Sequence, residues 1–201
     1  MPQKLIVGIQ GGKGSFNELA LRVYLERKSN PEADIEIKYL YTTERVLSEL
    51  KSGVIARGQF ATMNSIGGPV EETGLAQQKY SFDENYEVID QYSIQVVHCL
   101  MVHPEARLDE VDTIMTHPQV LAQCRDTIAR RYPRMILTEG QGDLIDPAKV
   151  GEAIARGSLP RNVATISNRL IADAWGLMIV DHDLQDRADN FTQFVFVKLR
   201  G

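Results

Sequence analysis

Polar side chains that could bind a small molecule stand where apolar, strand-like stretches end. Asn64 and Ser65 follow the apolar stretch 59–63, and the adjacent Gly67 and Gly68 allow the backbone to approach a ligand closely. Comparable hydroxyl residues occur at Ser15, Thr116, Ser167 and Thr192. The first N–H groups of a helix lack partners within the helix and can receive a carboxylate. The sequence therefore predicts a pocket for a small organic molecule that bears a carboxylate.

Each of these signals has a structural alternative. The glycine-rich segment 11–18 joins a first strand to a first helix, but its spacing differs from that of a phosphate-binding loop, because Lys13 precedes Gly14. It also lacks the G-x-G-x-x-G pattern of dinucleotide-binding folds. The segment is either a tight turn with a helix cap or a helix start that receives a carboxylate. In the same way, Asn64 and Ser65 taken alone are ordinary turn residues.

Composition excludes several other classes of function. The 201 residues carry a formal net charge of −5 and no basic stripe or basic amphipathic segment, so we expect neither a nucleic-acid nor a membrane partner. The chain begins with too short an apolar run for a signal peptide or a membrane span. The four histidines show no metal-ligand spacing, and two cysteines are too few for a disulfide framework. We expect a cytoplasmic protein without a metal or cofactor.

The scaffold for these side chains is predicted by apolar periodicity. Within 15–27, Phe16, Leu19 and Val23 recur at the spacing of a helix that buries one face. Strand-like apolar stretches recur at 4–9, 35–41, 59–63, 92–102, 113–115, 135–137, 163–166, 177–180 and 192–199. Strands that alternate with helices are typical of the α/β class.

Several helix starts are marked by their flanking residues. Capping boxes are predicted at 15–18 and 116–119, where a hydroxyl residue is followed three positions later by an acid or an amide. Pro69 and Pro147 predict helices whose first residue is proline, a position at which the missing N–H costs nothing.

Taken in order, these segments resemble the catalytic domain of the prephenate dehydratase family. The most specific piece is 116–124 (THPQVLAQC), which is similar to the family's S-H-P-Q-A-L-A-Q-C segment. The stretch 11–18 (GGKGSFNE) is similar to its G-P-E-G-T-F-S-E stretch. Further collinear matches to V-P-I-E-N-S…E-G-x-V-x-x-T, H-C-L, A-A-I-A-S…Y-G-L and N-x-T-R-F lie at 60–73, 98–100, 163–177 and 190–194. The resemblance covers nearly the whole chain.

The resemblance implies an α/β fold of two lobes, like that of type II periplasmic binding proteins, with an active-site cleft between the lobes. It implies one dehydratase-like domain over 1–201. We expect lobe one to comprise 1–92 plus 184–201 and lobe two to comprise 93–183. The long extended segments 92–102 and 192–199 suit strands that pass between such lobes.

The resemblance also implies a reaction. Prephenate loses its ring carboxylate as carbon dioxide and its C4 hydroxyl as water, which yields phenylpyruvate for phenylalanine biosynthesis. Aromatisation supplies much of the driving force, so the protein has to anchor the pyruvyl carboxylate, assist the leaving hydroxyl and shield the ring carboxylate from water. Thr192 stands at the family's catalytic threonine and, as a weak acid, is expected to act as a polarising hydrogen-bond donor or relay. The other matched positions, expected to bind substrate, are Ser15, Phe16, Asn64, Ser65, Gly68, Thr116, Gln119, Thr165, Ser167, Gln193 and Phe194.

The chain departs from the family pattern at two charged positions. Gln193 replaces the arginine of the closing motif, and Met63 replaces the acid before the Asn-Ser pair. Losing a charged partner for a carboxylate costs about 1.5–3 kcal/mol, but two opposite charges disappear together, so the changes can be a paired replacement. Because the sequence ends at Gly201, we expect it to lack the regulatory ACT domain of many relatives and, with it, a separate allosteric site for phenylalanine.

Two other functions stay open. One is a sibling lyase, either a non-aromatising prephenate decarboxylase or a lyase for a related cyclohexadienyl acid. Thr192 disfavours it, because a decarboxylase must not help the hydroxyl leave. The other is a non-catalytic module that binds a small carboxylate, which the charges missing at Gln193 and Met63 favour. In each case the partner is a small carboxylate, and the sequence leaves open a homodimer.

Overall fold

The computed structural model describes residues 4–28 and 35–201, and its contacts divide the chain into two compact units. Unit 1 holds the described residues of 1–12, 16–95 and 191–201, and unit 2 holds 13–15 and 96–190. These boundaries lie beyond the expected ones at 92/93 and 183/184. The reason is that strand β5 (Tyr86–Gln95) belongs to the sheet of unit 1 as far as its last residue, whereas Leu184 packs in the core of unit 2.

The sheet of unit 1 combines parallel and antiparallel strands. Its order is β2 (Ile35–Tyr39), β1 (Leu5–Ile9), β3 (Arg57–Asn64), β11 (Phe191–Leu199) and β5, with β4 (Gly68–Pro69) also paired to β3. β1 is parallel to β2 and β3, and β11 is antiparallel to β3 and β5. As a result, the last strand of the chain brings Thr192 directly opposite Asn64.

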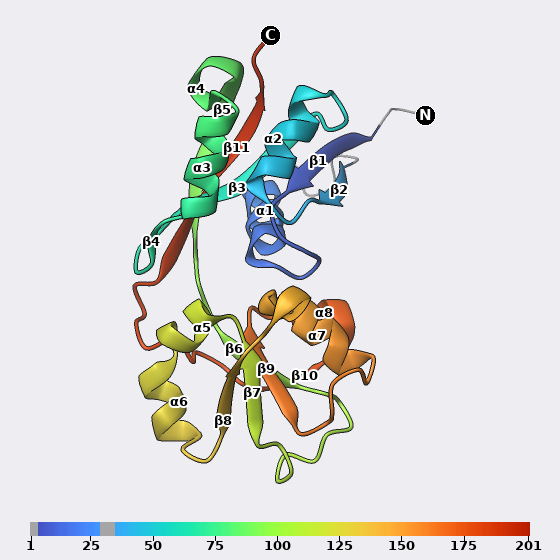
Figure 1. Cartoon of the computed structure of the whole chain (residues 1–201), viewed down its shortest axis with the longest axis vertical. Coiled ribbons are helices and arrows are strands. Elements are labelled where there is room, and N and C mark those ends of the chain that lie inside the picture. Colours follow the sequence, from blue (N-terminus) through green and yellow to red (C-terminus); the bar gives the residue numbers. More distant parts are fainter. Residues whose placement is uncertain (1–3, 29–34) are drawn as a thin grey trace. The chain divides into compact units, whose positions relative to one another are not determined.

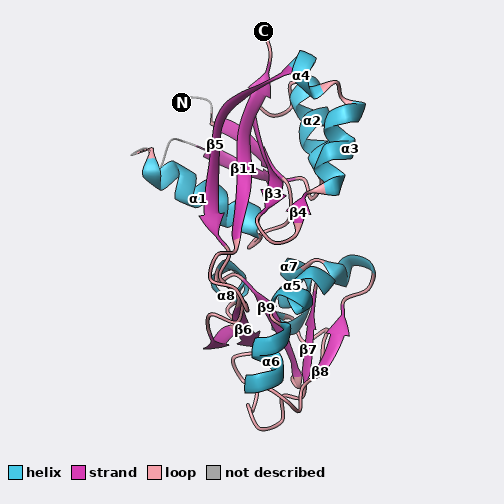
Figure 2. Cartoon of the chain, turned by 90° about the vertical axis from the view of Figure 1, so that its left-hand side faces the viewer, coloured by secondary structure: helices cyan, strands magenta, loops and turns pink. Residues whose placement is uncertain are grey.

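Helices cover both faces of this sheet (Figure 2). On one face lies α1 (Phe16–Arg27), whose Ala20 packs with Phe194 in one core cluster. On the other face lie α2 (Thr43–Lys51), α3 (Glu71–Lys79) and the short α4 (Phe82–Asn85), and Leu47 of α2 packs with Phe60 in a second cluster. Burial on both faces is consistent with the sequence of β1, whose residues are LIVGI.

Gly58 allows β3 to pack closely against α2. A Cβ atom at this position would lie 2.6 Å from Cγ1 of Val46 and 2.8 Å from Cδ1 of Leu50. We expect Gly58→Ala to lower the free energy of unfolding by about 1–3 kcal/mol, because overpacking strains a core. The matched control is Gly74→Ala on α3, where the new methyl would meet nothing within 4 Å, so it should raise that free energy by about 0.5–1 kcal/mol. Chemical denaturation measures both, and a Gly58→Ala protein as stable as its parent would contradict the prediction.

Unit 2 contains a second mixed sheet. Its order is β10 (Met178–Asp181), β6 (Cys99–Val102), β9 (Val163–Ser167), β7 (Thr113–Thr116) and β8 (Ile136–Glu139). β7 is parallel to β8 and β9, while β6 is antiparallel to β9 and β10. The carboxyl ends of β7 and β9 consequently meet at one edge, which is where parallel sheets commonly bind ligands.

Two pairs of helices cover this second sheet (Figure 1). α5 (Pro118–Gln123) and α6 (Arg125–Arg131) pack on one face, and α7 (Pro147–Ala155) and α8 (Leu170–Trp175) pack on the other. A 3₁₀ helix (Gly142–Ile145) precedes α7. The predicted proline start of α7 is confirmed, since the Asp146 side chain accepts a hydrogen bond from the backbone N–H of Ala148.

Three local predictions are wrong because long-range pairing overrides the local signal. The segment 92–102 is not one strand: β5 ends at Gln95 and β6 begins at Cys99, each in a different sheet. Gly68 and Pro69 do not begin a helix but form β4, where they pair with Asn64 and Met63. The helix cap expected at Thr116 is His117, whose Nδ1 accepts from the backbone N–H of Gln119, because Thr116 is still part of β7.

Within residues 4–28 and 35–201, no helix is both long and apolar enough to cross a membrane. The same described residues contain no group of three or more His, Cys, Asp or Glu side chains that could hold a metal ion.

Candidate active site

The centre of the candidate site in unit 1 is the hydrogen bond between Asn64 and Thr192. The Nδ2 group of Asn64 donates to Oγ1 of Thr192 over 2.9 Å and also reaches the carbonyl of Phe191 at 3.2 Å. The other end of the same amide accepts from the backbone N–H groups of Ile66 and Gly67 at 3.1 Å and 2.7 Å. Because Oδ1 faces two donors, Nδ2 must face Thr192. The threonine oxygen thus serves as an acceptor, and its own proton is available to a ligand.

Ser65 holds the start of β11 in place. Its backbone N–H donates to the carbonyl of Phe191 over 2.8 Å, and its Oγ accepts from the N–H of Phe191 over 2.9 Å. This reciprocal pair continues the register of β3 and β11 past Asn64. Gly68 follows with a φ of +79°, a conformation that suits glycine. Substrate binding by Ser65 and Gly68 stays a prediction, and the structure gives both residues a part in shaping this turn.

Gln193 and Met63 lie directly opposite each other on β11 and β3. A register shift follows them, so that Phe194 is opposite Ala61 and Thr62 is the additional residue of a β-bulge. Oγ1 of Thr62 donates to Oε1 of Gln193 over 3.3 Å. The two positions at which the chain departs from the family pattern are therefore cross-strand neighbours.

The two predicted phenylalanines belong to the hydrophobic core of unit 1. Phe194 is 0% exposed, and Phe16 packs against the cluster that contains it. Exposed apolar side chains occur instead at the turn itself, where Met63, Ile66 and Phe191 are 40%, 36% and 44% exposed. Met63 and Phe191 each precede a member of the Asn64–Thr192 pair along a strand, so their side chains lie on the opposite face of the sheet from that pair.

Gln10 and Glu72 form a hydrogen-bonded pair that the sequence analysis did not predict. Nε2 of Gln10 donates to Glu72 over 2.7 Å, and Oε1 of Gln10 accepts from the N–H of Ala61 over 3.0 Å. The Glu72 carboxylate also accepts from the N–H of Thr43 at the start of α2 over 2.8 Å, where the helix dipole favours negative charge. The position of Gln10, directly after the first strand, was the signal available in the sequence.

In unit 2, the predicted residues Thr116 and Ser167 end the parallel strands β7 and β9. Thr116 is 0% exposed and its hydroxyl donates to the carbonyl of Ile166 over 2.7 Å, while Ser167 is 3% exposed. Thr165 is 0% exposed, and its Oγ1 has no hydrogen-bond partner within the described part of the chain. Gln119, in the first turn of α5, is exposed. Of these four residues, Gln119 is thus the one with an accessible side chain.

Ser15 belongs to the loop 13–15, which packs with unit 2. The carbonyl of Gly14 accepts from Nδ2 of the buried Asn168 over 2.9 Å, and a Cβ atom at Gly14 would lie 3.1 Å from the Cα of Ile171. Nζ of Lys13 lies 5.4 Å from the centre of the Trp175 ring, within cation–π range. The glycine-rich segment is therefore a turn that packs against unit 2. For Lys13 and Gly14 this favours the tight-turn alternative over a role in binding a carboxylate. Binding by Ser15 stays a prediction.

Three residues of the quoted motifs form a buried network that sequence reasoning did not assign. His98 and Asn190 are 1% and 0% exposed. Oε1 of Gln123 is 3.0 Å from Nε2 of His98 and accepts from Nδ2 of Asn190 over 3.0 Å. Since this oxygen can only accept, the His98 ring presents Nε2–H. The sequence offered one indication of their importance, which is that each of the three residues lies in a different segment that matches the family pattern.

Burial gives this network a pH dependence. Burial lowers the pKa of His98 below its ordinary value, and the hydrogen bond that His98 donates to Gln123 offsets part of that effect. The unfolded chain then takes up a proton below about pH 6.5 while the folded chain resists it, so stability should fall as pH drops through this range. Urea unfolding at about pH 7.5 and about pH 5.5 measures the loss, which should be smaller in His98→Gln. Burial also lowers the pKa of His117, so the same slope in both proteins would assign it to His117 instead.

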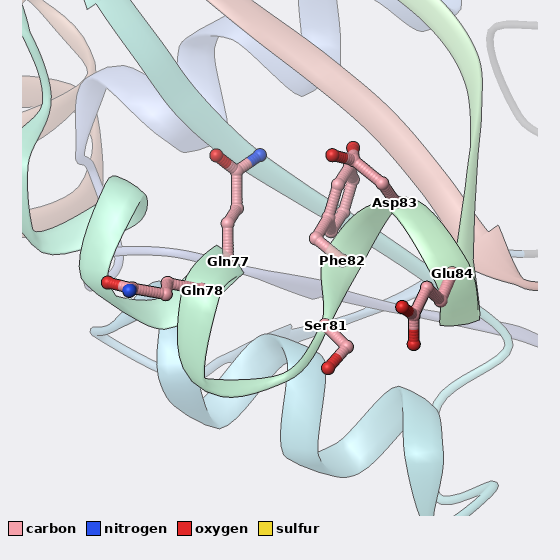
Figure 3. A pocket seen from close by; sticks show the side chains of 6 residues that line it. All are labelled: Gln77, Gln78, Ser81, Phe82, Asp83 and Glu84. Carbon is pink, nitrogen blue, oxygen red and sulfur yellow. The ribbon is translucent and has the colours of Figure 1, made fainter.

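Cavities also occur in other parts of the described chain. One, of about 270 Å³, lies at the junction of α3 and α4 in unit 1 and is lined by Gln77, Gln78, Ser81, Phe82, Asp83 and Glu84 (Figure 3). Another, of about 430 Å³, is in unit 2 and includes Asp109, Asp112, Arg131 and Arg134 in its lining. Neither contains a residue predicted to bind substrate.

Comparison with known proteins identifies a family. The sequence model described as prephenate dehydratase matches residues 7–201. Arogenate dehydratase 1 of Petunia hybrida is 25% identical over 194 residues, which cover 96% of this chain and 42% of the relative. A bifunctional chorismate mutase/prephenate dehydratase of Pseudomonas aeruginosa is 26% identical over 200 residues, which cover 98% of this chain and 49% of the relative. The chain thus spans less than half the length of these relatives.

Solved structures show the same fold. The prephenate dehydratase of Arthrobacter aurescens in complex with L-Phe has a TM-score of 0.80 at 22% identity, covering 98% of this chain and 61% of that one. GqqA, described as a novel type of quorum quenching acylase, has a TM-score of 0.78 at 21% identity, covering 98% and 64%. At this identity the likeness concerns the fold alone, and it confirms the predicted α/β class.

Proposed function

Because the chain belongs to the prephenate dehydratase family, we propose that it is a carbon–oxygen lyase that converts prephenate to phenylpyruvate. The observation that carries the proposal is the orientation of Thr192 by Asn64, with the amide nitrogen 2.9 Å from the threonine oxygen. This arrangement leaves the threonine proton to a ligand, as a group that assists a leaving hydroxyl requires.

In the proposed reaction the bond between the ring and its carboxylate breaks, and carbon dioxide leaves. The electron pair of that bond enters the ring, and the C4 hydroxyl departs and becomes water on taking up a proton. Thr192 hydrogen-bonds the departing oxygen and spreads the negative charge that develops on it.

A second candidate substrate, arogenate, is favoured by the charges near the turn. Arogenate carries an ammonium group where prephenate carries a keto oxygen, and several relatives are named arogenate dehydratases. The residue opposite Met63 is the neutral Gln193, and α3 begins with the acids Glu71 and Glu72. A neutral residue in place of the arginine of the family pattern, with acids at the start of α3, suits a substrate that brings its own positive charge.

Incubation of the purified protein with prephenate, and separately with arogenate, tests the proposal. Ultraviolet absorbance and mass spectrometry identify the product. Phenylpyruvate from prephenate, or phenylalanine from arogenate, supports a dehydratase. Loss of carbon dioxide without aromatisation would indicate a decarboxylase instead. Binding without any product would indicate a binding module and overturn the proposal.

A further inference from the structure

Asn190 is held firmly just before the strand that carries Thr192. It is 0% exposed, its Nδ2 donates to Gln123 over 3.0 Å, and its carbonyl accepts from the N–H of Val96 over 2.8 Å. The next residue, Phe191, begins β11. Side chain and backbone of Asn190 are therefore both fixed two residues before the candidate catalytic threonine.

Gln123 connects this anchor to two other segments of unit 2. Its Oε1 accepts from both His98 and Asn190, and its backbone carbonyl accepts from the N–H of Asp186 over 2.8 Å. His98 is fixed in turn, since its N–H donates to Gln185 over 2.9 Å and its carbonyl accepts from the N–H of Leu184 over 3.1 Å. The network thus ties the residues before β6, the end of α5 and the residues before β11 together.

From this arrangement we propose that His98, Gln123 and Asn190 act as positioning residues for Thr192, an inference that rests on the proposed function. The network holds the backbone at Asn190, so β11 enters its sheet in the register that places Thr192 opposite Asn64. A catalytic hydroxyl displaced by about 1 Å can lose on the order of a hundredfold in rate. Fixing residue 190 therefore protects the 2.9 Å contact on which the chemistry depends.

The polar chemistry of the network supports this role over simple core packing. Three apolar side chains would fill the same buried space without the need to satisfy donors and acceptors. A buried polar network, in contrast, tolerates only the arrangement that satisfies its members, and so it specifies one conformation of the segments that it joins. Such specificity is useful where the next residues carry the reacting group.

The test compares Asn190→Ala with Asn162→Ala, a control in the same unit whose Nδ2 bonds Asp112. We expect Asn190→Ala to lower kcat by about tenfold or more with little change in KM, because a displaced Thr192 acts on the transition state rather than on binding. The control should keep the parent's kcat. His98→Phe should behave like Asn190→Ala, and His98→Gln, which retains a donor, should recover part of the rate. A rise in KM as large as the fall in kcat would overturn the inference. So would a His98→Gln protein that recovers none of the rate lost in His98→Phe.

A double-mutant cycle separates positioning from general damage. If the network acts through Thr192, adding Asn190→Ala to Thr192→Val should reduce kcat no further. A loss equal to that in the parent background would overturn the inference.

A final measurement, amide hydrogen exchange, does not require enzymatic activity. It therefore distinguishes failure of this inference from failure of the proposed function. In Asn190→Ala, the amide protons of Val96 and Phe191 should exchange with solvent faster than in the parent, as measured by NMR. Unchanged exchange would overturn the positioning role even in an active enzyme. Faster exchange in a protein that turns over neither substrate would support the anchoring and contradict only the proposed function.

Discussion

Replacing Thr192 with valine is expected to lower kcat for the dehydration by about 10²–10⁴-fold, the usual worth of a positioned proton donor. Valine keeps the branched shape of the side chain but removes the hydroxyl, so the leaving oxygen loses its hydrogen bond while β11 stays in place. Nδ2 of Asn64 keeps its second acceptor, the carbonyl of Phe191 at 3.2 Å. Steady-state kinetics with prephenate and with arogenate measures the effect, and thermal unfolding should show a fold close to the parent's.

Two further variants make this result specific. Thr192→Ser retains the hydroxyl and should keep most of the activity. Thr113→Val removes a hydroxyl that bonds Asp112 at the start of β7, far from the candidate site in sequence, and should leave kcat unchanged. A Thr192→Val protein that is as active as its parent would show that the hydroxyl has no part in the chemistry.

Introducing arginine at Gln193 is expected to lower kcat/KM by about tenfold, which corresponds to about 1.4 kcal/mol. The substitution removes the side-chain acceptor of the Thr62 hydroxyl and sets a charge opposite the apolar Met63. An unpaired charge at a partly dry position costs free energy that a paired one recovers. The double variant Gln193→Arg with Met63→Glu should therefore regain the lost activity, because the two side chains are cross-strand partners.

Measurement of kcat/KM for the parent, both single variants and the double variant completes the cycle. Strictly additive effects would contradict a paired replacement. An increase in turnover for Gln193→Arg alone would instead show a dehydratase that is weakened by a missing cation.

What the sequence determined by itself is mostly local. The helix that begins at Asp146 and Pro147 was predictable, because a capping carboxylate and a proline at the first position act within one turn. The alternation of strands and helices predicted the α/β class, because burial of one face imposes its period on each element. The order of the motifs along the chain identified the family, which requires no knowledge of contacts.

The tertiary structure overruled local signals where a partner strand was present. Thr116 could have capped a helix, but it pairs with Glu139 of β8, and the cap moves to His117. Pro69 could have begun a helix, but pairing with Met63 draws it into β4. In both cases hydrogen bonds between strands satisfy the backbone groups that the local motif would have used.

The candidate site itself was decided by the tertiary structure. Asn64 and Thr192 are 128 residues apart, and their contact depends on the register of β11 against β3, including the bulge at Thr62. A shift of one residue would turn the threonine to the other face of the sheet. The sequence shows that both residues are polar and stand at strand ends, but the distance between them in the folded protein cannot be predicted from it. That separation follows from strand pairing and core packing between distant segments, which form only when the whole chain folds.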